Sequence, residues 1–155
     1  MRDIHQWLRD YAQSHTHPTN ERLHWVCVPL IVLSLVGLLW AIPAPSWLRG
    51  LFPLANWATL FLLASLAYYL MLSFALTLGM VPVLAIIVAA VWWLDGLAAP
   101  LWLVSAIIFV VAWIGQFIGH AVEGKRPSFF EDVQFLMIGP LWLLAAVYRR
   151  LGIPY

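Results

Sequence analysis

Four stretches of this sequence contain no Asp, Glu, Lys or Arg, and together they make up most of its length. They are residues 23–48, 50–94, 96–122 and 133–148, with 26, 45, 27 and 16 residues. The composition agrees, because 64% of the residues are hydrophobic and 10% are charged, whereas an ordinary soluble domain is about 45–50% apolar and about 25% charged. A soluble fold of this size could not bury so much apolar surface. The sequence therefore predicts an integral membrane protein.

The length of the charge-free stretches predicts how many helices cross the bilayer. A spanning helix needs about 20 apolar residues, so the first and third stretches hold one helix each and the second holds two, with Gly79 and Pro82 at the turn between them. The predicted spans are about 25–42, 55–77, 80–95, 100–121 and 133–148. For the last of these, three alternatives stay open: it spans, re-enters or lies at the interface. We predict one all-α membrane domain over residues 1–155, a helical bundle of four to five spans.

The first 24 residues have a pattern of their own. Acidic and basic residues are mixed there without an apolar run after a basic start, so we expect this segment to be retained rather than cleaved as a signal. Apolar residues recur at the i, i+3, i+4, i+7 spacing of one helix face. These positions are Ile4, Trp7, Leu8 and Tyr11. This helix either lies on the membrane surface or packs on the protein's own polar cap. Pro18 and Asn20 are expected to break it before the first span.

The Lys and Arg residues predict the orientation of the bundle. If four helices separate the two ends, five cations lie at one membrane face and Arg49 lies at the other. The five are Arg2, Arg9, Arg22, Lys125 and Arg126. Cytoplasmic loops are the ones enriched in Lys and Arg, so we expect the N-terminus in the cytoplasm.

The same count of spans gathers polar side chains that are far apart in the sequence. His15 and His24 precede the first span and His120 ends the fourth, so an even number of crossings brings them to one face. His120 and Glu123 are three residues apart, which puts them on the same helix face and suits two ligands of one metal ion. Asn20 lies one turn before His24 and could fix a histidine tautomer or orient a water. This set predicts a site for Fe(II), Mn(II) or Zn(II) rather than Cu(I).

Other interpretations of these residues stay open. A single histidine at a membrane rim is more often an amphipathic interface residue than a ligand, and His5 and His17 have weaker claims than the other three. Two further classes compete with an enzyme. A metal-binding membrane protein for transport or lipid binding would need polar groups along the spans, which are scarce here, and a structural protein would tolerate loss of the histidines. The net charge of +1 offers no basic field for nucleic acid.

Two motifs resemble those of a known family, the membrane 2-hydroxy fatty acid dioxygenases, which comprise fungal enzymes of phytosphingosine breakdown and their bacterial relatives. The motifs are Tyr11-x3-His15-x4-Asn20-x3-His24-x4-Pro29 and Gln116-Phe117-x-Gly119-His120-x2-Glu123-x3-Pro127. The resemblance runs from about Trp7 to Tyr148.

The resemblance implies an Fe(II)-dependent oxygenase that uses molecular oxygen to shorten a 2-hydroxy fatty acid by one carbon. His15, His24 and His120 match the family's histidines and would be the iron ligands. Glu123 would be a further ligand or a catalytic base beside them, and Asn20 a catalytic motif position. The resemblance further implies a bacterial inner membrane or a membrane of the endoplasmic reticulum type. The Lys and Arg pattern puts the metal site, like the N-terminus, on the cytoplasmic side.

Overall fold

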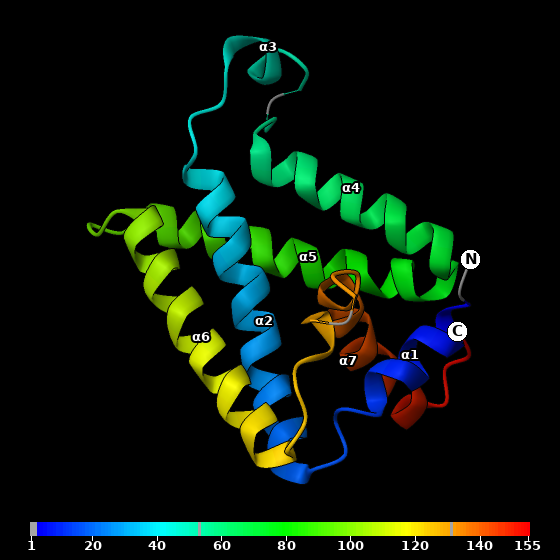
Figure 1. Cartoon of the computed structure of the whole chain (residues 1–155). Helices are drawn as coiled ribbons and strands as arrows, with labels where there is room; N and C mark the ends of the chain where they lie inside the picture. The colour runs from blue at the N-terminus through cyan, green and yellow to red at the C-terminus, as the bar shows by residue number, and fades with distance from the viewer. Residues whose placement is uncertain (1–2, 53, 131) are drawn as a thin grey trace.

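The computed structural model describes residues 3–52, 54–130 and 132–155, and these residues form helices joined by short connections (Figure 1). The elements are α1 (Ile4–Ala12), α2 (Pro18–Ala41), α3 (Ser46–Arg49), α4 (Trp57–Leu72), α5 (Phe74–Asp95), α6 (Leu101–Glu123), the 3-10 helix η1 (Ser128–Phe130) and α7 (Phe135–Leu151). No strand occurs in the described part of the chain. The predicted all-α class is confirmed. Arg2, one of the cations used for orientation, lies outside the described residues.

Within the part of the chain that the structure describes, three helices are long and apolar enough to cross a membrane, namely α2, α5 and α6 with 24, 22 and 23 residues. They make the chain an integral membrane protein with a helical bundle. Helix α4 is apolar but has only 16 residues, and α7 has 17 and ends in Arg149 and Arg150. Whether α4 and α7 also cross stays a prediction.

The turn inside the long second stretch lies at Ser73, so its prediction at Gly79 and Pro82 was wrong. The Ser73 backbone is extended, and its hydroxyl accepts a hydrogen bond from the third residue of α5 at 3.2 Å, as helix N-caps do. Pro82 lies within α5, because neighbouring groups in membrane helices can compensate for the hydrogen bond that a proline removes. Gly79 instead makes room for Tyr148 of α7, whose hydroxyl donates to the Ala75 carbonyl at 3.1 Å.

Helix α2 begins at Pro18, seven residues before the predicted span. Proline is favoured at the first helical position because its fixed φ suits the helix and its missing N–H would have no partner there. His17 caps the helix, since its Nδ1 accepts a hydrogen bond from the Thr19 amide at 3.2 Å. Pro18 therefore starts the helix rather than breaking one, and Asn20 lies in its first turn. This places Asn20 and His24 on one helix face.

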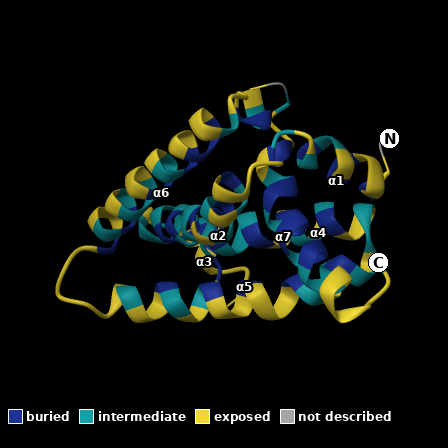
Figure 2. Cartoon of the chain, turned by 90° about the horizontal axis from the view of Figure 1, so that it is seen from below, coloured by how far each residue is buried: buried dark blue, intermediate teal, exposed yellow. Residues whose placement is uncertain are grey.

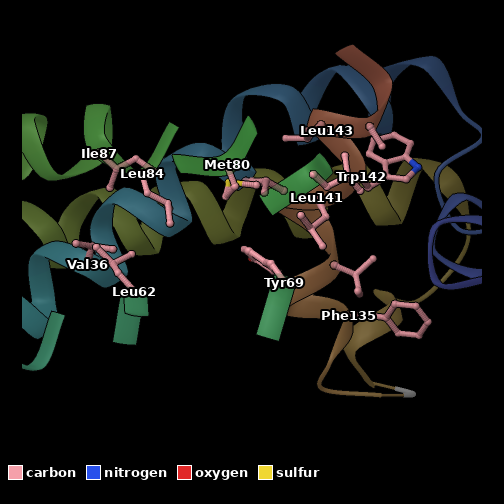
Figure 3. Packing of buried hydrophobic residues seen from close by; sticks show 14 of the residues in the cluster. Val36, Leu62, Tyr69, Met80, Leu84, Ile87, Phe135, Leu141, Trp142 and Leu143 are labelled. Carbon is pink, nitrogen blue, oxygen red and sulfur yellow. The ribbon is translucent and has the colours of Figure 1, made fainter. Parts of the chain in front are cut away.

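The apolar stripe of α1 packs against the protein. Trp7 meets Phe135 edge to face at 5.2 Å between ring centroids, and Tyr11 meets Trp142 at 5.6 Å. All four stripe residues are 5–6% exposed. Of the two interpretations of the amphipathic helix, packing on the protein's own cap is the one that the structure bears out. Phe135 and Trp142 continue into the buried core that α7 shares with α4 and α5, where Tyr69 and Met80 lie (Figure 3).

Helices α2 and α6 lie side by side and antiparallel, whereas the α4–α5 hairpin runs across α2 (Figure 1). Small residues allow the close approach of α2 and α6: Gly37 faces Ser105, Gly115 faces Cys27, and Gly119 faces Asn20. The outer faces of α5 and α6 carry exposed apolar side chains (Figure 2). Because the pair is antiparallel, the N-terminal end of α2 and the C-terminal end of α6 meet.

Candidate metal centre

Three histidines from different segments converge where α2 and α6 meet. His15 lies in the connection between α1 and α2, His24 lies one turn into α2 beyond Asn20, and His120 lies in the last turn of α6. Their ring centroids are 4.1 Å apart for His15 and His24, 5.0 Å for His15 and His120, and 5.2 Å for His24 and His120. One nitrogen of each ring lies within 4.8 Å of the other two, so the group could hold a metal ion.

Backbone carbonyls determine where the protons of two of these rings lie. His15 Nδ1 is 2.5 Å from the Tyr11 carbonyl and His24 Nδ1 is 3.0 Å from the Asn20 carbonyl. A carbonyl only accepts hydrogen bonds, so each Nδ1 is the donor and each neutral ring keeps a lone pair on Nε2. These two Nε2 atoms are 2.8 Å apart. Two facing lone pairs repel each other, and a cation bound between the rings would relieve that repulsion.

The surroundings of His15 keep its ring neutral. The pKa of His15 is lowered to about 4, chiefly because burial penalises the charged ring, with a smaller contribution from His120, while the Tyr11 carbonyl and Glu123 oppose the shift. The ring stacks on Tyr11 at 4.1 Å between centroids with an angle of 15° between the planes. A neutral, rigidly held imidazole is the form that coordinates a metal ion.

His120 supplies a third free nitrogen. Its Nδ1 is buried and has no hydrogen-bond partner among the described residues. A buried polar atom without a partner costs about 1–3 kcal/mol, so such atoms need an explanation in a folded protein. A nitrogen without a hydrogen-bond partner beside two facing lone pairs fits a bound cation, and the residues therefore suit the metal that the sequence predicted.

Glu123 lies beside the three histidines but is not part of their cluster. Its Oε1 accepts from the Thr16 amide at 3.0 Å and the Thr16 hydroxyl at 2.5 Å, and its Oε2 accepts from the His17 amide at 2.7 Å and the Asn20 side chain at 3.2 Å. Both carboxylate oxygens are thus engaged by the segment that carries His15. In this structure Glu123 fastens that segment to the end of α6.

Asn20 also links the segment that carries His15 to the end of α6, and it does so from within the protein interior. Its side chain is fully buried, and its Nδ2 donates to the Ser14 carbonyl at 3.0 Å and to Glu123. Its own carbonyl is the acceptor that orients His24. It packs against Gly119, where a Cβ would come within 2.5 Å of Asn20 Oδ1. Asn20 therefore connects the carboxylate to the orientation of a histidine.

The other two histidines lie outside the cluster. His5 is exposed on α1, with its ring 5.6 Å from that of Tyr155. His17 caps α2. These positions agree with the expectation that His5 and His17 are weaker candidates for metal ligands than the other three histidines.

A cavity opens from the histidines toward the apolar part of the bundle. It is lined by His15, His24, His120, Tyr11, Val28, Ile31, Val32, Trp113, Gln116, Pro127, Ser128, Phe129, Phe135, Leu136 and Gly139. The described residues that line it include no Lys, Arg, Asp or Glu. A separate polar groove contains Lys125, Arg126 and Asp10, and Ser128 and Phe135 border both spaces. Sequence reasoning named the histidines but missed Gln116 and Trp113 as part of the site, although both share a helix face with His120.

Comparison with known proteins identifies a family. The model of a family described as 2-hydroxy-palmitic acid dioxygenase Mpo1-like matches residues 1–151. No curated protein and no solved structure matches the chain. The matched region includes the three histidines, Asn20 and Glu123.

Proposed function

The chain belongs to the Mpo1-like family, and from that premise we propose that it is an Fe(II)-dependent membrane oxygenase that shortens 2-hydroxy fatty acids by one carbon. The family description supports the substrate class and the reaction type. The observation that carries the proposal is the group of three buried histidines at the mouth of an apolar cavity. Metal ligands on one side and a lipid-compatible space on the other are what such a reaction requires.

In this proposal His15, His24 and His120 hold the iron. The carbonyls of Tyr11 and Asn20 keep two of the rings in the tautomer that directs Nε2 to the metal. Bound Fe(II) would supply open coordination positions and one-electron chemistry with oxygen. Glu123 and Asn20 remain members of the proposed site, and their contacts favour a positioning role: they hold the connection that carries His15 and the turn that carries His24.

The substrate's two ends would bind to different parts of the cavity. The hydroxyl and carboxylate of a 2-hydroxy acid form a five-membered chelate, so this end belongs at the histidines. The acyl chain would extend along Val28, Ile31 and Val32 of α2, where apolar contact stabilises it. The overall reaction balances without another reductant: the acid and O2 give the fatty acid one carbon shorter, carbon dioxide and water.

We also propose that the site faces the cytoplasm and that residues 1–155 act as one domain. The cations near the site favour this orientation. Single cysteines at Thr19 and Lys125 should be labelled from the same side of sealed vesicles by a membrane-impermeant thiol reagent. Buried Cys27 gives a low background. Labelling of the two cysteines from opposite sides would contradict the prediction that His24 and His120 lie at the same membrane face.

Oxygen uptake tests the reaction. Purified full-length protein reconstituted with Fe(II) should consume oxygen when 2-hydroxyhexadecanoic acid is added, and its product should be pentadecanoic acid. The 3-hydroxy isomer should react poorly, because its six-membered chelate presents a different carbon to the metal. The metal content must be measured on the same sample. Protein that retains iron and binds the acid yet consumes no oxygen would favour the alternative, a metal-dependent lipid-binding protein.

A further inference from the structure

The side of α6 that faces the cavity carries two hydrogen-bond donors that the histidine cluster does not use. Trp113, Gln116 and His120 lie at i, i+3 and i+7, so they share one face of the helix, and all three line the cavity. Trp113 Nε1 and Gln116 Nε2 are both buried without a hydrogen-bond partner among the described residues. Gln116 is only 4% exposed.

Buried donors of this kind point to an acceptor that occupies the cavity. An indole N–H can only donate, and a glutamine amide offers two N–H groups. Leaving such groups unpaired in an apolar space is costly, and the part of the lining that α2 contributes beyond His24 is apolar, formed by Val28, Ile31 and Val32. Whichever way the Gln116 amide is turned, its polar end lies in the same space.

The donors lie where a 2-hydroxy acid bound to a metal at the histidines would place its second carboxylate oxygen, the one that does not bind the metal. One carboxylate oxygen and the hydroxyl are used when the acid chelates a metal, and the second carboxylate oxygen then needs a donor. Gln116 is one helical turn from His120, a rise of about 6 Å. The described lining includes no Lys or Arg to serve this oxygen, so neutral donors are the groups available to it.

We infer that Gln116, assisted by Trp113, binds the free carboxylate oxygen of the substrate and thereby makes the site select acids over neutral lipids. This inference rests on the proposed function, because it assumes that a 2-hydroxy acid is the ligand. Gln116 would be a specificity-determining residue. Trp113 would add a donor while its ring stays packed edge to face on Phe129, 5.1 Å away between centroids.

Binding of two matched lipids without oxygen tests the inference apart from turnover. The probes are radiolabelled 2-hydroxyhexadecanoic acid and 1,2-hexadecanediol, which keeps the chain and the 2-hydroxyl but has no carboxylate. Full-length protein should bind the acid more tightly. Gln116→Leu should weaken acid binding roughly tenfold or more, as loss of a hydrogen bond to a charged group does, and should leave diol binding unchanged. Trp113→Phe should have a smaller effect in the same direction.

The controls separate a binding role from a packing role. Trp102→Phe alters an exposed tryptophan of the same helix and should change neither affinity. Equal loss of both lipids in Gln116→Leu would mean that the cavity has collapsed, and no acid preference in the wild-type protein would mean that the donors serve another purpose; either result overturns the inference.

Oxygen uptake by the same variants separates this inference from the proposed function. An acid preference that depends on Gln116 in protein that never consumes oxygen would uphold the inference and reject the oxygenase. Oxygen uptake with an unchanged KM for the acid in Gln116→Leu would uphold the oxygenase and reject the inference about Gln116.

Discussion

The two ends of the α2–α6 pair handle their polar side chains differently. At the far end and in the hairpin, serine and threonine hydroxyls bond to their own helix: Ser34 donates to the Ile31 carbonyl, Ser65 to the Phe61 carbonyl and Thr77 to the Ser73 carbonyl. At the histidine end, polar groups bond across segments that are up to 114 residues apart, or have no partner among the described residues. A buried hydroxyl satisfied within its own turn needs nothing else. Groups that bond between segments hold a specific geometry, which is what a binding site requires.

The largest effect that this comparison predicts is at the histidine cluster itself. His24→Ala should remove bound metal and lower oxygen uptake by about 100-fold or more, because a misplaced or missing ligand disrupts the reacting geometry. Metal analysis of the purified variant and the oxygen electrode provide the two measurements. His5→Ala is the matched control, since His5 is exposed on α1. Equal metal retention in both variants would contradict the assignment of the three histidines.

A smaller effect is expected one step away from the cluster. Glu123→Gln keeps the size of the side chain but removes the charge that accepts hydrogen bonds from Thr16, His17 and Asn20. Loss of such outer contacts typically weakens metal binding by about 10–100-fold, and we expect a change of that size in a metal titration.

Glu21→Gln is the control for Glu123→Gln, because it removes a carboxylate from the first turn of α2 without touching these contacts. Complete loss of metal in Glu123→Gln, equal to that of His24→Ala, would instead favour Glu123 as a direct ligand.

The sequence predicted the helical membrane class because charge-free stretches of this length have few other solutions. It also predicted that His15, His24 and His120 would gather, and they do so because the N-terminal part of α2 lies against the C-terminal end of α6. The role of Glu123 was harder to predict: an i, i+3 pair shares a helix face, but only the path of residues 13–17 decides that its oxygens are taken by backbone amides. The turn was misplaced because Gly79 and Pro82 have strong general turn preferences, whereas the Ser73 cap and the contact of Gly79 with Tyr148 depend on tertiary packing.

The close approach of α2 to α6 has a signal in the sequence. Gly115 and Gly119 have the GxxxG spacing that lets membrane helices pack closely, and Gly119 is in contact with Asn20. The donors of Gln116 and Trp113 could not be recognised from the sequence, because only the packed cavity shows that they have no partner among the described residues.

The last and smallest effect compares two glycines of the same interface. An alanine Cβ at Gly119 would lie 2.5 Å from Asn20 Oδ1, so the buried Asn20 amide, which is hydrogen-bonded to the Ser14 carbonyl and Glu123, would have to move. At Gly37 an added Cβ would meet Ser105, chiefly its hydroxyl oxygen, which can rotate away. Overpacking of this kind typically costs about 1–3 kcal/mol, and we expect both substitutions to lower stability in thermal unfolding. Only Gly119→Ala should also weaken metal binding, because the Asn20 amide holds the connection that carries His15 through the Ser14 carbonyl and Glu123. If Gly37→Ala weakened metal binding equally, the two ends of the pair would be coupled and the geometry of the histidines would depend on the whole interface rather than on contacts at its rim.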